Sequence, residues 1–225
     1  MVRPPGGGGP ARPAPERLKS AKARSPSSRA WLERQIADPF AAEARAQGYR
    51  SRAALKLSEI DDRFGLIRRG VRAIDLGCAP GGWLQVATAR GARVVGVDLL
   101  PTEPVAGAMI LEGDFTDESC PARLIAALGG PPDLILSDMA PNTTSHRQTD
   151  HLRIVGLIEA GAAFALEALR PGGALLVKAF QGGETAVVVA SLKAAFADVR
   201  HVKPKASRAE SAELYLLARG FRGRG

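Results

Sequence analysis

The sequence has few of the residues from which disulfide scaffolds and metal sites are built. Its 225 residues include two cysteines, Cys78 and Cys120, and three histidines. Two cysteines are too few for a stapled secreted scaffold or a zinc site, and no histidine has a metal-ligand spacing to a cysteine or to clustered acids. No segment is long and apolar enough to span a membrane, and the Pro- and Gly-rich start lacks the apolar core of a signal peptide. We therefore expect a metal-free protein of the reducing cytoplasm.

Positive charge is concentrated near the start of the chain. The sequence has 31 Lys and Arg against 23 Asp and Glu, a net charge of +8, and residues 1–37 hold eight of the basic side chains and two of the acidic ones. Residues 1–26 cannot bury enough apolar surface to fold alone, so we expect a disordered basic tail followed by one domain over residues 27–225. Such a tail can bind RNA or only keep the chain in solution, and the sequence leaves both open.

A glycine-rich turn after an apolar run is the most informative local feature. The run 71–76 is typical of a short buried strand, and Gly77, Gly81 and Gly82 let the chain bend and approach a ligand before a helix begins. Dinucleotide enzymes have a turn here too, but their Gly-x-Gly-x-x-Gly spacing fails because residue 79 is Ala. A turn that merely connects strand to helix is the other alternative. We favour a site for a cofactor that carries adenosine.

Acidic residues accompany the ends of three apolar runs. Asp75 lies near the end of the first run, Asp98 ends the second and Asp114 follows the third. In an open parallel sheet the ligand crevice lies beyond the carboxyl ends of the strands. We expect Asp98 to accept ribose hydroxyls and Asp114 to meet an adenine amino group. A single acid at a strand end is often structural, but three in corresponding positions favour a bound cofactor.

Strand-like and helical segments alternate along the chain, which predicts a parallel sheet flanked by helices. The expected strands are 71–76, 92–97, 108–111, 133–137, 174–177, 199–203 and 213–218. The expected helices are 52–64, 82–90, 121–128, 151–169 and 185–196. No helix separates the last two strands, so we expect them to pair antiparallel, with Glu213 returning toward the cleft.

Two further polar residues follow expected strands. Asp138 comes directly after the fourth strand, and Lys178 ends the fifth. A lysine at a strand end is usually solvated, but the segment 179–183 follows it closely, and a lysine among apolar neighbours is rarely buried unpaired. We therefore expect both side chains to point into one cleft.

Several motifs together resemble the FtsJ/RrmJ-type ribosomal RNA 2′-O-methyltransferases, also called the RlmE family. The resemblance runs from about Trp31 onward and rests on the segments 48–57, 77–83, 137–142 and 177–182. It implies an α/β, Rossmann-like fold that depends on S-adenosylmethionine, with a mostly parallel seven-stranded sheet, an antiparallel last strand and helices on both faces. It also implies a Lys-Asp-Lys-Glu catalytic tetrad, which falls on Lys56, Asp138, Lys178 and Glu213. The cofactor contacts that it implies are Gly81, Trp83, Asp98, Asp114 and Asp138.

The tetrad suits the methylation of a ribose hydroxyl. The hydroxyl must lose its proton while it is aligned with the methyl donor. Our hypothesis is that Lys178 is the base, since a second cation, Lys56, and partial desolvation would favour its neutral form. Asp138 and Glu213 would then hold the ammonium groups in place. An ordinary set of ion pairs is the alternative. The turn Asp-Met-Ala-Pro differs from the Asp/Asn-Pro-Pro-aromatic turn typical of enzymes that methylate base amines, which favours a hydroxyl acceptor.

The resemblance implies a large-subunit substrate, namely a uridine in the A-loop of 23S rRNA, and we expect a monomeric enzyme. The alternatives are a tRNA ribose methyltransferase, a non-catalytic assembly factor and a nicotinamide-dependent dehydrogenase. An assembly factor would be expected to lose a tetrad residue, and the turn at 77–82 disfavours a dehydrogenase. Candidate RNA contacts, for which a solvated basic face is equally compatible, are Arg34, Tyr49, Arg50, Arg52 and Lys205. The polar segment 142–150 is a candidate lid over the RNA site.

Overall fold

The computed structural model describes residues 38–141, 147–181, 186–208 and 211–223. Pro39–Gly225 form one compact unit. The expected tail, Arg34 and His146 lie outside the described residues, so the expectations about them are not tested. Of the candidate lid, residues 147–150 begin a helix and 142–146 also lie outside the described part.

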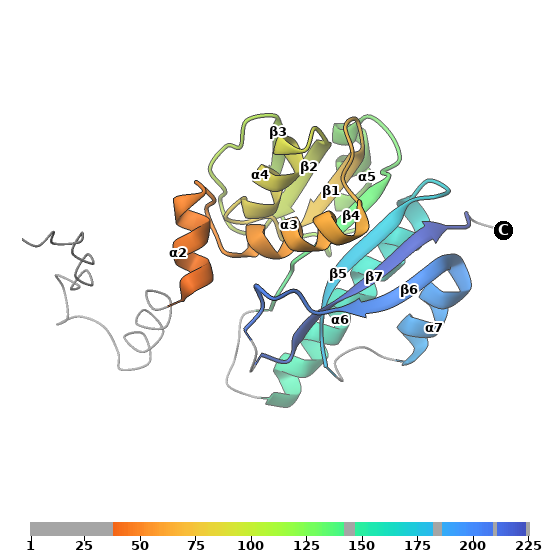
Figure 1. The fold of residues 1–225 in the computed structure, drawn as a ribbon. Helices are drawn as coiled ribbons and strands as arrows, with labels where there is room; N and C mark the ends of the chain where they lie inside the picture. The colour runs from red at the N-terminus through yellow and green to blue at the C-terminus, as the bar shows by residue number, and fades with distance from the viewer. Residues whose placement is uncertain (1–37, 142–146, 182–185, 209–210, 224–225) are drawn as a thin grey trace, which may run out of the picture. The chain divides into compact units, whose positions relative to one another are not determined.

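Helices and strands alternate along most of the unit (Figure 1). The helices are α2 (Pro39–Ala46), α3 (Ala53–Phe64), α4 (Gly82–Ala89), α5 (Cys120–Leu128), α6 (Arg147–Ala168) and α7 (Ala186–Ala195). The strands are β1 (Arg72–Leu76), β2 (Arg93–Asp98), β3 (Ala108–Glu112), β4 (Leu134–Ser137), β5 (Ala174–Phe180), β6 (Phe196–Val202) and β7 (Glu213–Phe221).

The strands form one sheet in the order β3-β2-β1-β4-β5-β7-β6. Pairing is parallel from β3 through β5, whereas β7 is antiparallel to both β5 and β6. The chain moves outward from β1 to β3 and then returns to the other side of β1 with β4, so the order reverses between β1 and β4. Ligands of open α/β sheets bind at such a reversal, beyond the carboxyl ends of the strands. The α/β fold expected from the sequence, with its antiparallel last strand, is confirmed.

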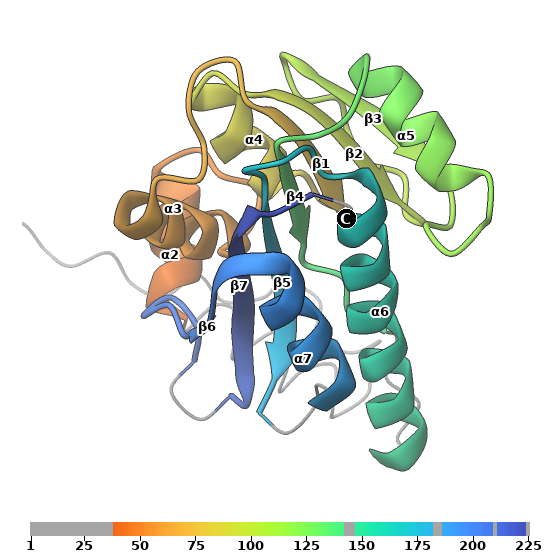
Figure 2. The ribbon, with the colours of Figure 1, turned by 90° about the vertical axis from the view of Figure 1, so that its right-hand side faces the viewer.

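Helices cover both faces of the sheet (Figure 2). One core joins α5, α6 and α7 to inward side chains such as Ile74, Val97 and Val177, and the other joins α3 and α4 to Ala73, Leu136 and others. Successive residues of a strand point to opposite faces, which is why Ile74 and Ala73 enter different cores. The central strands are buried on both faces, which fits the apolar residues Ala73, Ile74 and Leu76 of β1 and the three apolar residues 134–136 of β4.

The structure differs from the expected elements at three places. Helix α2 was not expected; only Ala44 of it is buried, so its apolar periodicity is weak, although Pro39 suits the first turn of a helix. Helix α6 begins at Arg147 rather than at residue 151. The residues before 151 are polar, which is typical of a loop, so the sequence did not indicate the first turn of this helix. Strand β6 begins at Phe196, directly after α7, where the ring of Phe196 packs 5.2 Å from that of Phe221 in β7.

Candidate active site

The four tetrad residues come from separate elements that meet near the carboxyl ends of β4 and β5. Asp138 follows the last residue of β4, and Lys178 lies in the second half of β5. The antiparallel register places Glu213, the first residue of β7, opposite Phe180 of β5. Lys56 reaches this region from helix α3. The structure thus brings together all four residues that the sequence indicated.

Lys178 and Asp138 form a close pair. The Nζ of Lys178 lies 2.9 Å from Oδ1 of Asp138 and also donates a hydrogen bond of 2.7 Å to its backbone carbonyl. The side chain of Lys178 is 9% exposed and that of Asp138 17% exposed. Because one ammonium group contacts two atoms of the same residue, the position of Lys178 depends directly on that of Asp138.

Lys56 and Glu213 form a second pair beside the first. The Nζ of Lys56 donates to Oε1 of Glu213 over 2.5 Å, and the hydroxyl of Ser207 donates to the same oxygen over 2.8 Å. Burial acts to raise the pKa of Glu213, but the charge and hydrogen bond of Lys56, the charge of Lys178 and the Ser207 hydroxyl outweigh it and lower the pKa. Glu213 is therefore a carboxylate that both lysines influence, and the two pairs form one electrostatic cluster.

Tyr215 joins this cluster, a contact that the sequence did not predict. Its hydroxyl donates a hydrogen bond of 2.8 Å to Oδ1 of Asp138, the oxygen that faces Lys178. Burial, with the negative charges of Asp138 and Glu213, raises the pKa of Tyr215 well above its usual value, so the hydroxyl stays a donor. The available signal was its spacing: in a strand, residue 215 shares a face with residue 213.

The glycine turn lies close to Asp138. A Cβ on Gly77, whose φ is +76°, would lie 2.8 Å from Cγ and 2.9 Å from Cα of Met139, so only glycine allows this approach. Gly81 has a φ of +106° and precedes helix α4. Asp98 fixes the other side of the turn, since its Oδ2 accepts the N–H of Ala79 over 2.8 Å. Its Oδ1 accepts the N–H of Leu100 over 2.8 Å.

Asp75 lies beneath this turn with no exposed surface. Neither of its carboxylate oxygens has a hydrogen-bond partner among the described residues. Burial raises the pKa of Asp75 well above its usual value, and the negative charges of Asp138 and Asp98 raise it further. Asp75 therefore favours its protonated, uncharged form in the folded protein.

The other two expected cofactor residues differ in their surroundings. Asp114 lies in a local turn, where its Oδ1 accepts the hydroxyl and the N–H of Thr116 over 2.6 and 2.8 Å, and these bonds lower its pKa. Trp83 is buried in the core, its indole N–H donates to the carbonyl of Ala53 over 2.7 Å, and its ring lies 5.7 Å from that of Tyr215. Contact of either residue with a cofactor stays a prediction.

Two of the candidate RNA contacts have internal hydrogen bonds. The guanidinium of Arg50 donates to the carbonyls of Pro80, Glu103 and Pro104, which ties the segment before α3 to the glycine turn. Arg52 donates to the carbonyl of Ala206. The sequence did not indicate these structural roles. Tyr49 is partly buried and Lys205 is exposed.

Cys78 and the possible metal ligands among the described residues indicate which kinds of chemistry the site does not favour. Burial, with the charges of Asp75 and Asp98, raises the pKa of Cys78 to about 12, so its thiol is protonated and is not a nucleophile at neutral pH. Within the described residues, no group of three or more His, Cys, Asp or Glu side chains is placed to hold a metal ion. The same part of the chain has no helix that is long and apolar enough to cross a membrane.

Comparison with known proteins shows the family to which the chain belongs. A model of the FtsJ-like methyltransferase family matches residues 49–221. The chain is 64% identical to the ribosomal RNA large subunit methyltransferase E of Caulobacter sp. (strain K31) and 61% identical to that of Caulobacter vibrioides, in both cases over 100% of each chain.

Solved structures show the same fold. A ribosomal RNA methyltransferase from Plasmodium falciparum matches with a TM-score of 0.68 and 29% identity over 78% of this chain and 100% of that one. The MycE methyltransferase of mycinamycin biosynthesis matches with a TM-score of 0.52 and 14% identity, over 75% of this chain and 50% of that one, which shows the fold alone. The fold is thus a Rossmann-like methyltransferase fold. The chain belongs to the FtsJ-like methyltransferase family.

Proposed function

We propose that this protein transfers the methyl group of S-adenosylmethionine to a ribose 2′-hydroxyl of large-subunit ribosomal RNA, with the A-loop uridine of 23S rRNA as its target. The observation that carries the proposal is the cluster formed by the pairs Lys178–Asp138 and Lys56–Glu213 at the carboxyl ends of the strands. The relatives named as ribosomal RNA large subunit methyltransferase E support the choice of RNA. We propose further that the enzyme works as a cytoplasmic monomer.

The cleft has features that fit the cofactor. S-adenosylmethionine supplies a methyl group on a positively charged sulfur and also carries an ammonium group. The negative charges of Asp98 and Asp138, which both act on the buried Asp75, would favour a positively charged ligand in this cleft. The residues that would hold it are Gly81, Trp83, Asp98, Asp114 and Asp138. Oδ2 of Asp114 has no hydrogen-bond partner among the described residues and could accept an adenine amino group.

Lys178 would remove the proton from the ribose hydroxyl. In the structure its ammonium group faces Asp138, so it must first lose a proton to act as a base. The hydrogen bond from Tyr215 to Asp138 reduces the negative charge available to hold that ammonium group. Glu213 holds Lys56 in the cluster through their ion pair. A positioned base of this kind accelerates a reaction by about 10²- to 10⁴-fold.

The substrate can be tested directly. The protein is incubated with methyl-labelled S-adenosylmethionine and, separately, with large subunits, small subunits and bulk tRNA from cells that lack the enzyme. We expect label in large-subunit RNA, at one uridine ribose. Label in tRNA alone would overturn the proposed target but keep the chemistry. Cofactor binding without label in any RNA would favour the non-catalytic assembly factor.

A further inference from the structure

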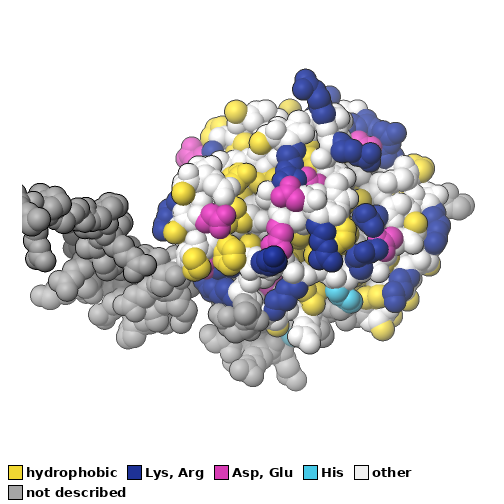
Figure 3. All heavy atoms as spheres, in the orientation of Figure 1, with side chains coloured by type: hydrophobic (Ala, Val, Ile, Leu, Met, Phe, Trp, Pro, Cys, Tyr) yellow, Lys and Arg dark blue, Asp and Glu magenta, His cyan; other side chains and the backbone are white. Residues whose placement is uncertain are grey.

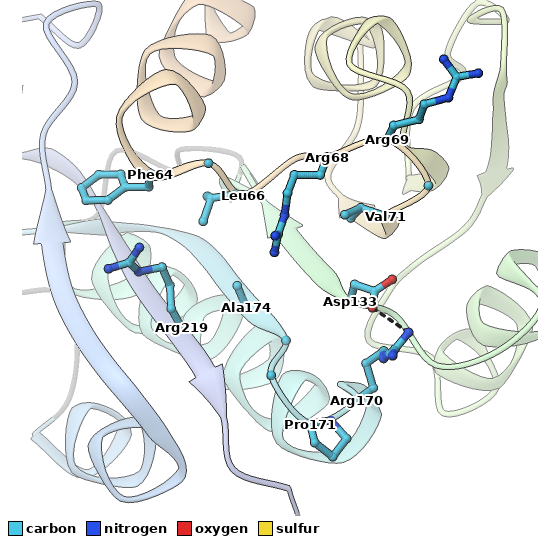
Figure 4. A pocket seen from close by; sticks show the side chains of 14 residues that line it. Phe64, Leu66, Arg68, Arg69, Val71, Asp133, Arg170, Pro171, Ala174 and Arg219 are labelled. Carbon is cyan, nitrogen blue, oxygen red and sulfur yellow. Dashed lines mark ion pairs between the residues drawn. The ribbon is translucent and has the colours of Figure 1, made fainter.

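A basic hollow lies at the opposite end of the sheet from the tetrad. It has a volume of about 610 Å³ and is lined by the α3–β1 connection, the start of β5 and the end of β7. Lining residues that matter here are Phe64, Arg68, Asp133, Arg170 and Arg219. Figure 4 shows Arg68 pointing into the hollow, whereas Arg69 points away from it.

Topology separates the hollow from the active site. Ala174, the first residue of β5, lines the hollow, whereas Lys178 lies near the other end of that strand. Asp133, just before β4, also lines it, and Asp138 follows β4. At about 3.3 Å per residue, the four residue steps from Ala174 to Lys178 cover roughly 13 Å of β5. The hollow is therefore a second surface of the molecule.

Positive charge exceeds negative charge in and around the hollow. Asp133 pairs with Arg170 over 3.0 Å, and Asp198 pairs with both Arg200 and Arg219 over 2.7 and 2.6 Å. Arg63 and Arg68 are exposed, and no ion pair or side-chain hydrogen bond is found for either among the described residues. Figure 3 shows Lys and Arg side chains gathered on this face. The surface therefore attracts anions.

An aromatic ring stands among these arginines. The guanidinium carbons of Arg63, Arg219 and Arg200 lie 4.9, 5.4 and 5.7 Å from the centre of the partly buried Phe64 ring. The three come from different elements: α3, β7 and β6. Combinations of arginine and aromatic side chains contact phosphates and bases in RNA-binding proteins.

The sheet itself explains why this face is polar. Leu217 and Tyr215 of β7 join the core under α3 and α4, and Arg219, two residues further along, points to the same side. Arg200 of β6 lies opposite Leu217 in the register. Arg200 and Arg219 thus lie on the face of the sheet that α3 and α4 cover elsewhere. Their exposure follows from their positions in β6 and β7.

We propose that this surface, formed by Phe64 with Arg63, Arg68, Arg200 and Arg219, binds the sugar-phosphate backbone of RNA at a distance from the methylated nucleotide. The inference rests on the proposed function in that the RNA is part of the same substrate. Held at two separated surfaces, a large RNA is oriented as well as bound, since contacts with phosphates fix register without reading sequence.

The test compares two double variants that each remove two positive charges. Arg63→Ala/Arg68→Ala alters the hollow, and Arg123→Ala/Lys193→Ala alters exposed positions on α5 and α7. Binding to a labelled RNA duplex of about 20 base pairs is measured over a range of salt concentrations, without cofactor. We expect the first variant to bind about 10-fold more weakly and to lose about two units of salt slope, since each phosphate contact contributes about one unit. The control should lose about two-fold at most.

Methyl transfer to large subunits is the second readout. We expect the hollow variant to need more subunits for half-maximal rate but to reach the wild-type rate at saturation. Equal losses in the two variants, or none, would overturn the inference. The inference would also be overturned if the hollow variant bound normally to the duplex and to protein-free rRNA but weakly to assembled subunits. That result would show that the surface binds a ribosomal protein. If the wild type transferred no methyl group, the proposed function would fail, while the duplex measurement would still decide this inference.

Discussion

Asp138 contacts Lys178 and Tyr215 through two of its oxygen atoms. Its Oδ1 accepts the hydroxyl of Tyr215 and faces Lys178, and its carbonyl accepts Lys178 as well. A lysine so placed can serve as a base or only as the partner of an ion pair. The two roles differ in one property: a base must be able to lose its proton, whereas an ion-pair partner needs only its charge.

Replacing Lys178 by arginine separates these roles. Arginine keeps the positive charge beside Asp138 but is not deprotonated in proteins. We expect Lys178→Arg and Lys178→Ala to reduce methyl transfer by at least about 10²-fold each, with cofactor affinity nearly unchanged. Single-turnover rates and calorimetric cofactor binding measure the two effects. Lys193→Ala, at an exposed position of α7, is the control and should keep the wild-type rate. An arginine variant that kept the rate would assign Lys178 to an ion pair only.

Asp75 should make the stability of the protein depend on pH. Because burial raises its pKa in the folded protein, the carboxyl is protonated when folded at pH values where the unfolded chain is ionised. Asp75 therefore lowers the stability of the fold as the pH rises above 3.8, the ordinary pKa of an Asp side chain. As the pH rises from 4.5 to 8, we expect the unfolding free energy of the wild type to fall relative to that of Asp75→Asn. Urea unfolding of both proteins measures this difference. A difference that did not change with pH would contradict this.

At the scale of elements, the glycine turn is held by a close approach as well as by backbone conformation. Gly77 and Gly48 have almost equal φ values of +76° and +78°, but only Gly77 has close neighbours where a Cβ would lie. An alanine at either position bears the cost of the left-handed conformation, about 1 kcal/mol. At position 77 it also meets Met139, beside Asp138.

We therefore expect Gly77→Ala to destabilise the protein by roughly 2 kcal/mol more than Gly48→Ala, the usual scale of overpacking. Gly77→Ala should also weaken cofactor binding, since the added methyl group would displace either the glycine turn or Met139, which lies beside Asp138. Urea unfolding and calorimetric binding of S-adenosylmethionine check the pair. Equal losses in the two variants would show that close approach has no role at Gly77.

The ion pair of Lys56 with Glu213 joins helix α3 to the start of β7. We expect Glu213→Gln to lower the unfolding free energy at pH 7 by roughly 2–3 kcal/mol, slightly less than is usual for a broken buried pair, because Glu213 is 15% exposed. The pKa of Glu213 is lowered on folding, so this stabilisation is present above its ordinary value of 4.5 and is lost as the pH falls through the lower, folded value.

Urea unfolding between pH 7 and pH 3 measures that loss. Glu118→Gln, at an exposed position, provides the control and should change stability by no more than about 0.5 kcal/mol. A Glu213→Gln defect of the same size at both ends of the pH range would show that the carboxylate charge does not stabilise the fold.

Sequence patterns predicted the elements best where burial was complete. The runs that became β1, β4 and β5 are largely buried and mostly apolar, and the ends of β4 and β5 correctly placed Asp138 and Lys178 at one end of the sheet. Tyr215 was missed because its hydrogen bond to Asp138 joins residues 77 positions apart. That contact depends on the antiparallel register of β5 and β7, which sequence patterns do not give. Helix α2 was missed because a helix with one buried residue has little periodicity.

At the scale of the whole molecule, the sheet places different chemistry at its two ends. Carboxylates and the two lysine pairs lie at the carboxyl ends of the parallel strands, and arginines surround the hollow at the other end. The first arrangement suits a positively charged cofactor and a hydroxyl, and the second suits phosphates. A large RNA substrate could contact both surfaces at once.

The position of the transferred methyl group tests the central claim most directly. Large-subunit RNA labelled by the wild-type protein is digested to nucleosides, and the labelled product is identified by chromatography and mass spectrometry. The account predicts that the label is in 2′-O-methyluridine and is absent when Lys178→Arg is used. Label in a base-methylated nucleoside would contradict it, because the cluster around Lys178 would then not act on a ribose hydroxyl.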